Sequence, residues 1–161
     1  MKKYELTGET INVFGKTLHR IRATRDFSNV HAGDLGGFIE DERNLSHDEN
    51  AWVGGNARVS GNAWVGGNAL VGGNAWVGGN ALVKGPRDIY WISCIGSRNG
   101  TTTFFRNADN GISVACGCFY GTIDEFAAAV TKTHGDNEHA RAYRHAIEIA
   151  KLRIELEVAK S

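Results

Sequence analysis

The sequence is short of proline, of net charge and of long apolar runs. Proline occurs once in 161 residues, whereas glycine occurs 21 times. Abundant glycine in a chain that is 42% hydrophobic fits neither disorder nor collagen, and it indicates a backbone that turns often around an ordinary core. The 18 basic and 18 acidic residues cancel. This balance argues against nonspecific binding to nucleic acid or to an anionic membrane, because both need surplus positive charge.

Features of membrane insertion and export are also missing. No apolar run is long enough to span a bilayer, and the opening residues Met-Lys-Lys-Tyr-Glu-Leu-Thr lack the apolar segment of a signal peptide. The three cysteines are an odd number, which does not suit a disulfide framework. We therefore expect a protein of a reducing cytosol.

Residues 50–85 are six consecutive hexapeptides without insertions. They read NAWVGG, NARVSG, NAWVGG, NALVGG, NAWVGG and NALVKG. A period of six fits neither an amphipathic helix nor a plain alternating strand, and it predicts a short extended segment followed by a turn. Side chains alternate along a strand, so each alanine shares an inward face with the valine two residues later. Glycine and asparagine supply the backbone angles of the corner.

Read from its valine, each unit is Val-Gly-Gly-Asn-Ala-Trp, which resembles the hexapeptide signature of left-handed parallel β-helices. In that family three hexapeptides form one triangular coil, and successive coils stack. The resemblance therefore implies two coils. It also implies a stacking register, in which Trp52 lies beneath Leu70, Arg58 beneath Trp76, and Trp64 beneath Leu82.

The outward positions of the repeat carry large apolar side chains. Either flanking segments of the same chain cover them or, as we favour, other subunits do, because large exposed apolar patches usually mark interfaces. Two coils are few for a free-standing repeat, and the resemblance implies a homotrimer or a higher oligomer. The predicted interface residues are Trp52, Trp64, Leu70, Trp76 and Leu82.

Residues 1–49 are predicted to form N-terminal strands and a degenerate first coil. Short strands are expected around 4–7, 11–14 and 18–24, with turns at Gly8 and Gly15. Running the repeat backwards places Leu35, Ile39 and Leu45 inward, but also Asp41 and His47, so we expect the register of 32–49 to slip. The segment Gly-Asp-Leu-Gly-Gly-Phe-Ile-Glu, followed by Asn-Leu-Ser, resembles bacteriophage and prophage hexapeptide proteins, which are often labelled transferases on the repeat alone.

Residues 86–161 are predicted to form an α+β domain that begins at the single proline. Three antiparallel strands are expected near 89–95, 101–106 and 112–119, joined by Asn-Gly turns. Thr122 and Glu125 form a capping box for a helix that ends at Gly135. A last helix is expected over 137–158, with a face formed by Tyr143, Ile147, Ala150, Ile154 and Val158. The predicted fold class is mainly β: a left-handed parallel β-helix of hexapeptides, with an N-terminal β cap and this C-terminal domain.

No catalytic or metal-binding residue is predicted. Cys94, Cys116 and Cys118 lack a Cys-x-x-Cys pair and a fourth ligand, so we expect them to pack in the core rather than bind zinc. Gly15-Lys16-Thr17 has the wrong spacing from Gly8 for a phosphate-binding loop, and we expect a hairpin turn. The resemblance implies a histidine base and coenzyme A for acyltransferases, and three histidines for the related zinc carbonic anhydrases. The repeats contain no histidine.

A basic cluster on the last helix is the candidate ligand site. Arg141, Arg144 and His145 follow i, i+3, i+4 spacing and share one side of the helix, whose N-terminus favours phosphate. The alternative is a solvated face paired with Glu138 and Glu148. The full predicted set also includes two further arginines, and two rings on which a base could stack. Its members are Arg98, Arg106, Arg141, Arg144, His145, Tyr90 and Trp91.

The resemblance to phage proteins then suggests a function. We expect a non-enzymatic oligomeric binding protein in the host bacterial cytosol that sequesters a nucleotide signal of bacterial immunity, of the cyclic nucleotide or cyclic ADP-ribose type. It would need no cofactor and would bind neither nucleic acid nor membrane. The alternatives are an acyltransferase-like enzyme, or a structural or assembly protein.

Overall fold

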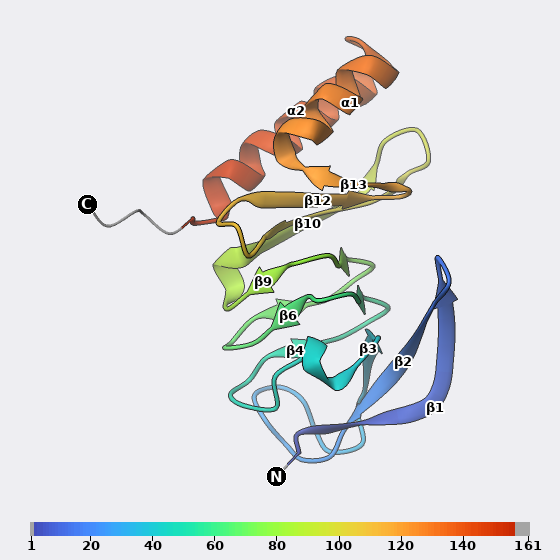
Figure 1. The fold of residues 1–161 in the computed structure, drawn as a ribbon, viewed down its shortest axis with the longest axis vertical. Coiled ribbons are helices and arrows are strands. Elements are labelled where there is room, and N and C mark those ends of the chain that lie inside the picture. The colour runs from blue at the N-terminus through green and yellow to red at the C-terminus, as the bar shows by residue number, and fades with distance from the viewer. Residues whose placement is uncertain (1, 157–161) are drawn as a thin grey trace, which may run out of the picture.

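A computed structural model describes residues 2–156, which form a mainly β molecule ending in two α-helices. Short parallel strand pairs occupy the middle, an antiparallel four-stranded sheet follows, and the helices lie at the far end (Figure 1). No helix within these residues is long and apolar enough to cross a membrane.

The hexapeptides give one two-residue strand each. The parallel pairs are Trp52 with Leu70, Arg58 with Trp76, and Trp64 with Leu82, so partners lie 18 residues apart and the predicted register is confirmed. The six strands are β4 (Trp52–Val53), β5 (Arg58–Val59), β6 (Trp64–Val65), β7 (Leu70–Val71), β8 (Trp76–Val77) and β9 (Leu82–Val83).

Backbone hydrogen bonds at a constant sequence offset link the repeats. The N–H of Trp52 donates to the carbonyl of Ala69, and the same offset recurs down the repeat as far as Gly66, which donates to Val83. Every alanine and valine of the six units is at most 2% exposed, which confirms the predicted inward face. Each of the first five units turns at a glycine with positive φ, and these are Gly55, Gly61, Gly67, Gly73 and Gly79.

The N-terminal segment begins with a long hairpin. β1 (Tyr4–Val13) and β2 (Lys16–Ala23) pair antiparallel around a turn at Phe14 and Gly15, as expected for that turn. The prediction of a second turn at Gly8 is wrong, because β1 runs through it with only a shift of register between Leu6 and Thr10. β2 also pairs antiparallel with β3 (Leu35–Ile39), and β3 in turn pairs parallel with β5.

The expected slip of register is present and has a definite size. Ile39 lies beside Val59 and Leu45 beside Val65, an offset of 20 rather than 18, so two extra residues lie between Leu45 and β4. Ile39 and Leu45 are buried as predicted. Leu35 is 57% exposed, contrary to expectation, because the pairing of β2 with β3 shifts between Arg20 and Arg22 and breaks the alternation.

The C-terminal sheet has four strands rather than three. They are β10 (Ile89–Ile95), β11 (Gly100–Arg106), β12 (Ile112–Cys116) and β13 (Phe119–Thr122). The last strand was missed because Gly117 and Cys118 make a tight turn without an Asn-Gly signal.

Two helices follow the sheet. α1 (Ile123–His134) starts at the predicted capping box and ends at Gly135. α2 (Glu138–Arg153) is shorter than predicted and buries Tyr143, Ile147 and Ala150. The predicted contribution of Val158 lies outside the described residues.

The sheet lies across the end of the repeat. The Trp91 ring packs over Gly72 and Gly73, and the N–H of Trp76 donates to Thr103 Oγ1 at 2.9 Å. A β-bridge joins Ala81 to Asn107. The contact brings turns of the C-terminal sheet beside β5 and β8, and this placement creates the site described next.

Candidate functional site

A cavity of about 860 Å³ opens where the hairpin, the repeat and the C-terminal unit meet. Its walls come from the hairpin tip, the β5–β8 pair, the β10–β11 and β12–β13 turns, the end of α1 and one tyrosine of α2. Its volume is within the range of small-molecule pockets. The lining residues used below are Phe14, Arg58, Trp76, Cys94, Arg98, Cys116, Cys118, His134 and Tyr143.

The cavity is cationic. Arg58 projects from the repeat and Arg98 from the β10–β11 turn, and neither guanidinium forms an ion pair or hydrogen bond with any residue between 2 and 156. Of the residues that the structure describes, no aspartate or glutamate lines the cavity. Arginine presents a planar set of donors that matches phosphate or carboxylate. The arrangement is therefore suited to a small anion.

One wall of the cavity is aromatic. The rings of Phe14 and Trp76 are stacked, with centroids 5.3 Å apart and planes inclined by 25°. The indole Nε1 of Trp76 lies 3.4 Å from Ser60 Oγ, and the backbone N–H of the same residue is bound by Thr103. These two contacts hold Trp76 in place as a flat surface in the cavity that the two arginines also line.

Tyr143 reaches the cavity from α2. Its hydroxyl lies 3.8 Å from the sulfur of Cys116, and its ring stacks near His134 at a centroid distance of 5.9 Å. Burial, followed by the neighbouring Cys116, raises the pKa of Tyr143 to about 12. The phenol therefore stays protonated at neutral pH and can act as a hydrogen-bond donor to a ligand.

All three cysteines of the chain line this cavity as free thiols. Cys94 and Cys118 are exposed, so the expectation of core packing is wrong for both: Cys94 lies at the irregular end of β10, where its φ is 59°, and Cys118 lies in the β12–β13 turn. Cys116 is partly buried and accepts a hydrogen bond from Thr102 Oγ1 at 3.2 Å. Within residues 2–156 no three histidine, cysteine or acidic side chains come together as a metal site.

The predicted basic cluster does not reach the cavity. Arg144 binds Asp136 Oδ1 at 2.9 Å, the carbonyl of Gly135 at 2.7 Å and Thr131 Oγ1 at 3.2 Å, so it closes the C-terminus of α1. Arg141 and His145 are exposed on α2 and are not among the lining residues. The alternative of a solvated, paired face describes this cluster better, although the partner of Arg144 is Asp136.

Three other predicted ligand residues make contacts within the fold and do not line the cavity. Arg106 is buried, with its Nη1 3.9 Å from Asp88 Oδ1. Tyr90 packs against Phe104 at 6.0 Å, and Trp91 covers the glycine corner of the repeat. Of the seven predicted ligand residues, only Arg98 lines the cavity.

The predicted interface residues have different surroundings. Trp52 is 6% exposed, because Phe27 meets its ring edge-on at 5.3 Å, so here the same chain provides the cover. Trp76 belongs to the cavity wall. Trp64 is 36% exposed, Leu70 is 57% exposed and Leu82 is half-buried, so these three remain available to another subunit.

Arg58 and Trp76 were missed as ligand residues, although the sequence contains a signal for both. Arg58 is the one charged residue at the outward position of the six repeats. The predicted register already placed it beneath Trp76, so a cation beside an indole could have been inferred. Nothing in the sequence pointed to Phe14 or to the convergence of the cysteines, which depend on contacts between distant segments.

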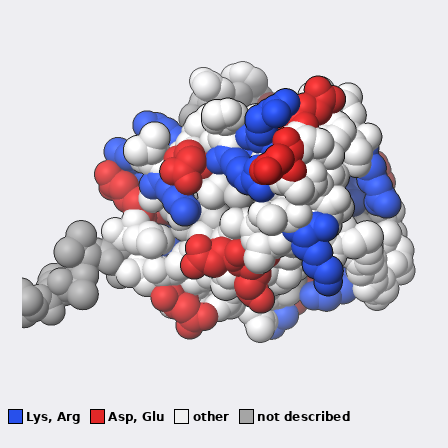
Figure 2. Space-filling model, turned by 90° about the horizontal axis from the view of Figure 1, so that it is seen from above, with Lys and Arg blue, Asp and Glu red and all other residues white. Residues whose placement is uncertain are grey.

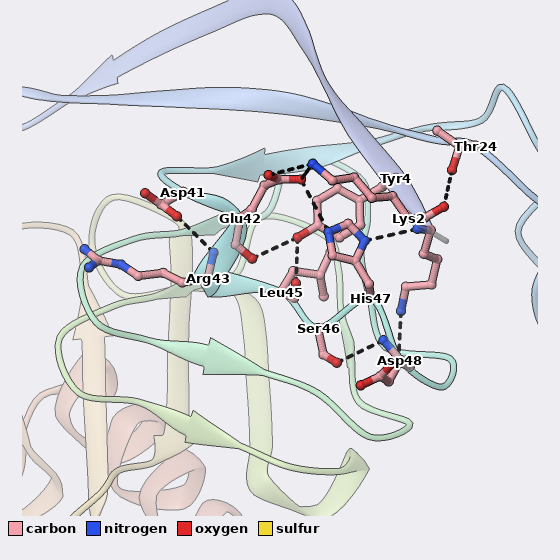
Figure 3. A network of polar contacts seen from close by, with 11 residues as sticks. Lys2, Tyr4, Thr24, Asp41, Glu42, Arg43, Leu45, Ser46, His47 and Asp48 are labelled. Carbon is pink, nitrogen blue, oxygen red and sulfur yellow. Dashed lines mark hydrogen bonds and ion pairs between the residues drawn. The ribbon is translucent and has the colours of Figure 1, made fainter.

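A second polar network lies at the opposite end of the repeat (Figure 3). Lys3 is fully buried, and its Nζ donates to the carbonyl of Ala51 at 2.5 Å and to those of Asp48 and Glu49 at 3.4 and 3.5 Å. Burial, with a smaller contribution from Arg25, lowers the pKa of Lys3 to about 8. The ammonium is enclosed by backbone carbonyls, so it acts as a structural cap.

Tyr4 and His47 complete the network. The Tyr4 hydroxyl donates to Leu45 O at 2.6 Å, and burial raises the pKa of this phenol. His47 stacks on the Tyr4 ring at 4.0 Å, and its Nδ1 accepts from the backbone N–H of Lys3 at 3.0 Å. Burial lowers the pKa of His47, so the neutral imidazole that this hydrogen bond requires is favoured.

The face at the helical end gives no further candidate. Seen from the helical end, lysines and arginines alternate with acidic residues and form no patch of one sign (Figure 2). The chain matches no model of a known protein family, and it matches no characterised protein significantly. The geometry of the cavity is therefore the observation from which a function can be inferred.

Proposed function

We propose that this chain is a non-enzymatic binding protein that captures a small nucleotide anion in the cavity. One observation carries the proposal: within residues 2–156, two arginines without partners line the same cavity as the Trp76 ring, and no carboxylate lines it with them. Guanidinium groups suit phosphates, and an indole offers a surface on which any base can stack.

The architecture supports a capturing role. We propose that the repeat winds as a left-handed parallel β-helix of two coils. The continuous 18-residue register and one positive-φ glycine per hexapeptide at five corners support this winding. Such a scaffold is rigid, because each coil is hydrogen-bonded to the next. A rigid wall holds Arg58 and Trp76 ready for a ligand and reduces the loss of freedom on binding.

We propose further that the chain assembles as a homotrimer or higher oligomer through Trp64, Leu70 and Leu82. The exposure of these apolar side chains supports the idea. Analytical ultracentrifugation should find an oligomer that Trp64→Glu dissociates, while the matched exposed change Arg43→Glu leaves it intact. A monomer at tens of micromolar would contradict this part of the proposal.

The resemblance to phage hexapeptide proteins suggests which nucleotide. We propose a signal of bacterial immunity, of the cyclic nucleotide or cyclic ADP-ribose type, captured stoichiometrically in the host cytosol. Stoichiometric capture needs a specific pocket and no catalytic group, and it leaves the ligand chemically intact.

Binding is tested by calorimetry and thermal shift with AMP, cyclic mononucleotides, cyclic ADP-ribose and acetyl-coenzyme A. A ligand at 100 times its Kd should stabilise the fold by about 2.7 kcal/mol. Arg58→Ala and Arg98→Ala should each weaken binding by about 1.5–3 kcal/mol, whereas Arg43→Ala, outside the cavity, should not. The bound nucleotide should be recovered unchanged after denaturation. Absence of binding by every nucleotide would overturn the proposal.

The exposed thiols report where the ligand binds. Cys94 and Cys118 line the cavity and should react with iodoacetamide in the free protein. A saturating nucleotide should slow both reactions without changing the fold. Unaltered alkylation in the presence of a bound nucleotide would place the ligand elsewhere.

The acyltransferase-like alternative has one observation in its favour, since His134 lines the cavity. Turnover of acetyl-coenzyme A that is abolished by His134→Gln would favour an enzyme over capture. If neither binding nor turnover is found, a structural or assembly role becomes the better explanation.

A further inference from the structure

Phe14 occupies a position that is unfavourable for a phenylalanine. It lies at the tip of the β1–β2 hairpin with φ of 50°, beside Gly15 with φ of 82°. Both angles are typical of a hairpin turn that prefers Asn-Gly, and the left-handed conformation costs a residue with a side chain about 1–2 kcal/mol. The ring is also 68% exposed. Neither the turn nor the core therefore explains an aromatic residue here.

The ring does have one partner, and that partner is in the cavity. Phe14 stacks on Trp76, which is 62 residues away along the chain and belongs to the repeat. Trp76 is fixed by Ser60 and Thr103, so the two rings differ in their freedom to move. Trp76 is the immobile half of the pair.

The tip of the hairpin extends beyond the residues of β2 that pair with β3. β2 pairs with β3 only from His19 onward, so beyond that point the two strands form an arm that rises beside the coils (Figure 1). Two-stranded hairpins are marginally stable on their own. Leu18 is fully buried and anchors the base of this arm. The tip is joined to the rest of the chain by an ion pair between Lys16 and Glu40 at 3.8 Å and by the stacking of the two rings.

We propose that Phe14 and Trp76 form an aromatic clamp that takes the planar base of the captured nucleotide between them, while Arg58 and Arg98 bind its phosphate. This inference rests on the proposed function and specifies the ligand as one with a flat heteroaromatic ring. A base between two rings needs centroids roughly 7 Å apart, twice the usual contact distance of ~3.5 Å. The present separation is 5.3 Å, so the arm has to open by only roughly 2 Å.

A binding experiment can measure the contributions of the base and of the phosphate separately. AMP carries both groups, whereas ribose 5-phosphate carries the phosphate alone, and both are titrated calorimetrically into the wild-type chain and Phe14→Asn. Asparagine suits the left-handed turn position, so this variant should be at least as stable thermally as the wild type. Leu6→Ala is the matched control, because Leu6 is an exposed apolar residue of the same hairpin outside the cavity lining.

Phe14→Asn should weaken AMP by about 5- to 150-fold, the usual effect of removing a stacking partner, and leave ribose 5-phosphate unchanged. Leu6→Ala should alter neither. If the wild type binds both ligands and Phe14→Asn weakens both equally or neither, the clamp is refuted while the proposed function stands. If the wild type binds neither AMP nor the other nucleotides, the proposed function fails and the clamp fails with it.

Discussion

The repeat and its two ends are stabilised in different ways. Inside the repeat the backbone bonds to itself at a constant offset, and the core needs only alanine and valine. At the N-terminal end the next coil is incomplete, and side chains take its place: Asn44 Nδ2 donates to the carbonyls of Gly61 and Ala63, and Lys3 to that of Ala51.

At the C-terminal end of the repeat, side chains supply hydrogen-bond acceptors rather than donors. There the backbone N–H groups of Trp76 and Lys84 need acceptors, which Thr103 Oγ1 and Asp88 Oδ2 provide at 2.9 and 2.8 Å. Buried backbone groups without a partner are costly, so each end of a short repeat must be closed by individually placed side chains. The comparison shows that a repetitive backbone is specified by a period, whereas its ends are specified residue by residue.

The largest effect is expected from a corner glycine of the repeat. A β-carbon on Gly67, whose φ is +60°, would collide with the carbonyl oxygen of Lys84 in the next coil. Gly67→Ala should therefore lower the free energy of unfolding by about 3–4 kcal/mol, measured by denaturant titration. Gly8→Ala, in open space on the hairpin, should change it by less than about 0.5 kcal/mol. Similar losses of unfolding free energy in both variants would contradict the idea that the backbone of the repeat is more tightly constrained than that of the N-terminal hairpin.

Two asparagine substitutions compare the N-terminal end of the repeat with its interior. Asn44 is fully buried and serves two carbonyls of the first coil, whereas Asn62 is an exposed residue of a hexapeptide. Asn44→Ala should destabilise the chain by about 2–3 kcal/mol, because those carbonyls lose their donors. Asn62→Ala should remain within about 0.5 kcal/mol. Thermal unfolding of the two variants side by side decides the point.

The lowered pKa of Lys3 predicts how the stability of the protein changes at alkaline pH. Its pKa is about 8 in the folded protein against 10.5 for the ordinary side chain, so between these values the unfolded chain binds more protons than the folded one. This difference makes stability rise with pH from about 8 towards 10, and Lys3→Met should flatten that rise.

At neutral pH Lys3→Met should cost about 1–2 kcal/mol, because Ala51 loses its donor. Lys2→Met, which removes an exposed pair with Glu42, is the control and should cost less than about 0.5 kcal/mol. Chemical denaturation at several pH values compares the three proteins, and parallel pH profiles for wild type and Lys3→Met would contradict the interpretation.

The smallest effect concerns the helical unit. Arg144 is exposed enough that Arg144→Ala should cost only about 1 kcal/mol, through the lost bond to the carbonyl of Gly135. Nucleotide affinity should not change, in contrast to Arg58→Ala. A loss of nucleotide affinity in Arg144→Ala would instead place the ligand at the basic cluster of α2 that the sequence pattern predicted.

The sequence by itself determined the regular half of the molecule. The hexapeptide period was enough to predict the inward Ala and Val faces and the pairing of Arg58 with Trp76, because a constant period leaves one register in which all small apolar side chains are buried. The capping box at Thr122 and Glu125 was equally predictable, since its bonds are local. Local and periodic features need no knowledge of the rest of the fold.

Only the tertiary structure decided the site. Arg144 and Arg98 are both arginines near turns. Nothing in the local sequence shows that Arg144 closes α1, whereas Arg98 lines the cavity without a partner among residues 2–156. Phe14 gains its role from a ring 62 positions away, and the three cysteines come to one cavity from β10, from β12 and from the turn after β12. Such contacts depend on how the hairpin and the C-terminal sheet are placed against the repeat, and this placement is set by packing between distant segments, which leaves no periodic trace in the sequence.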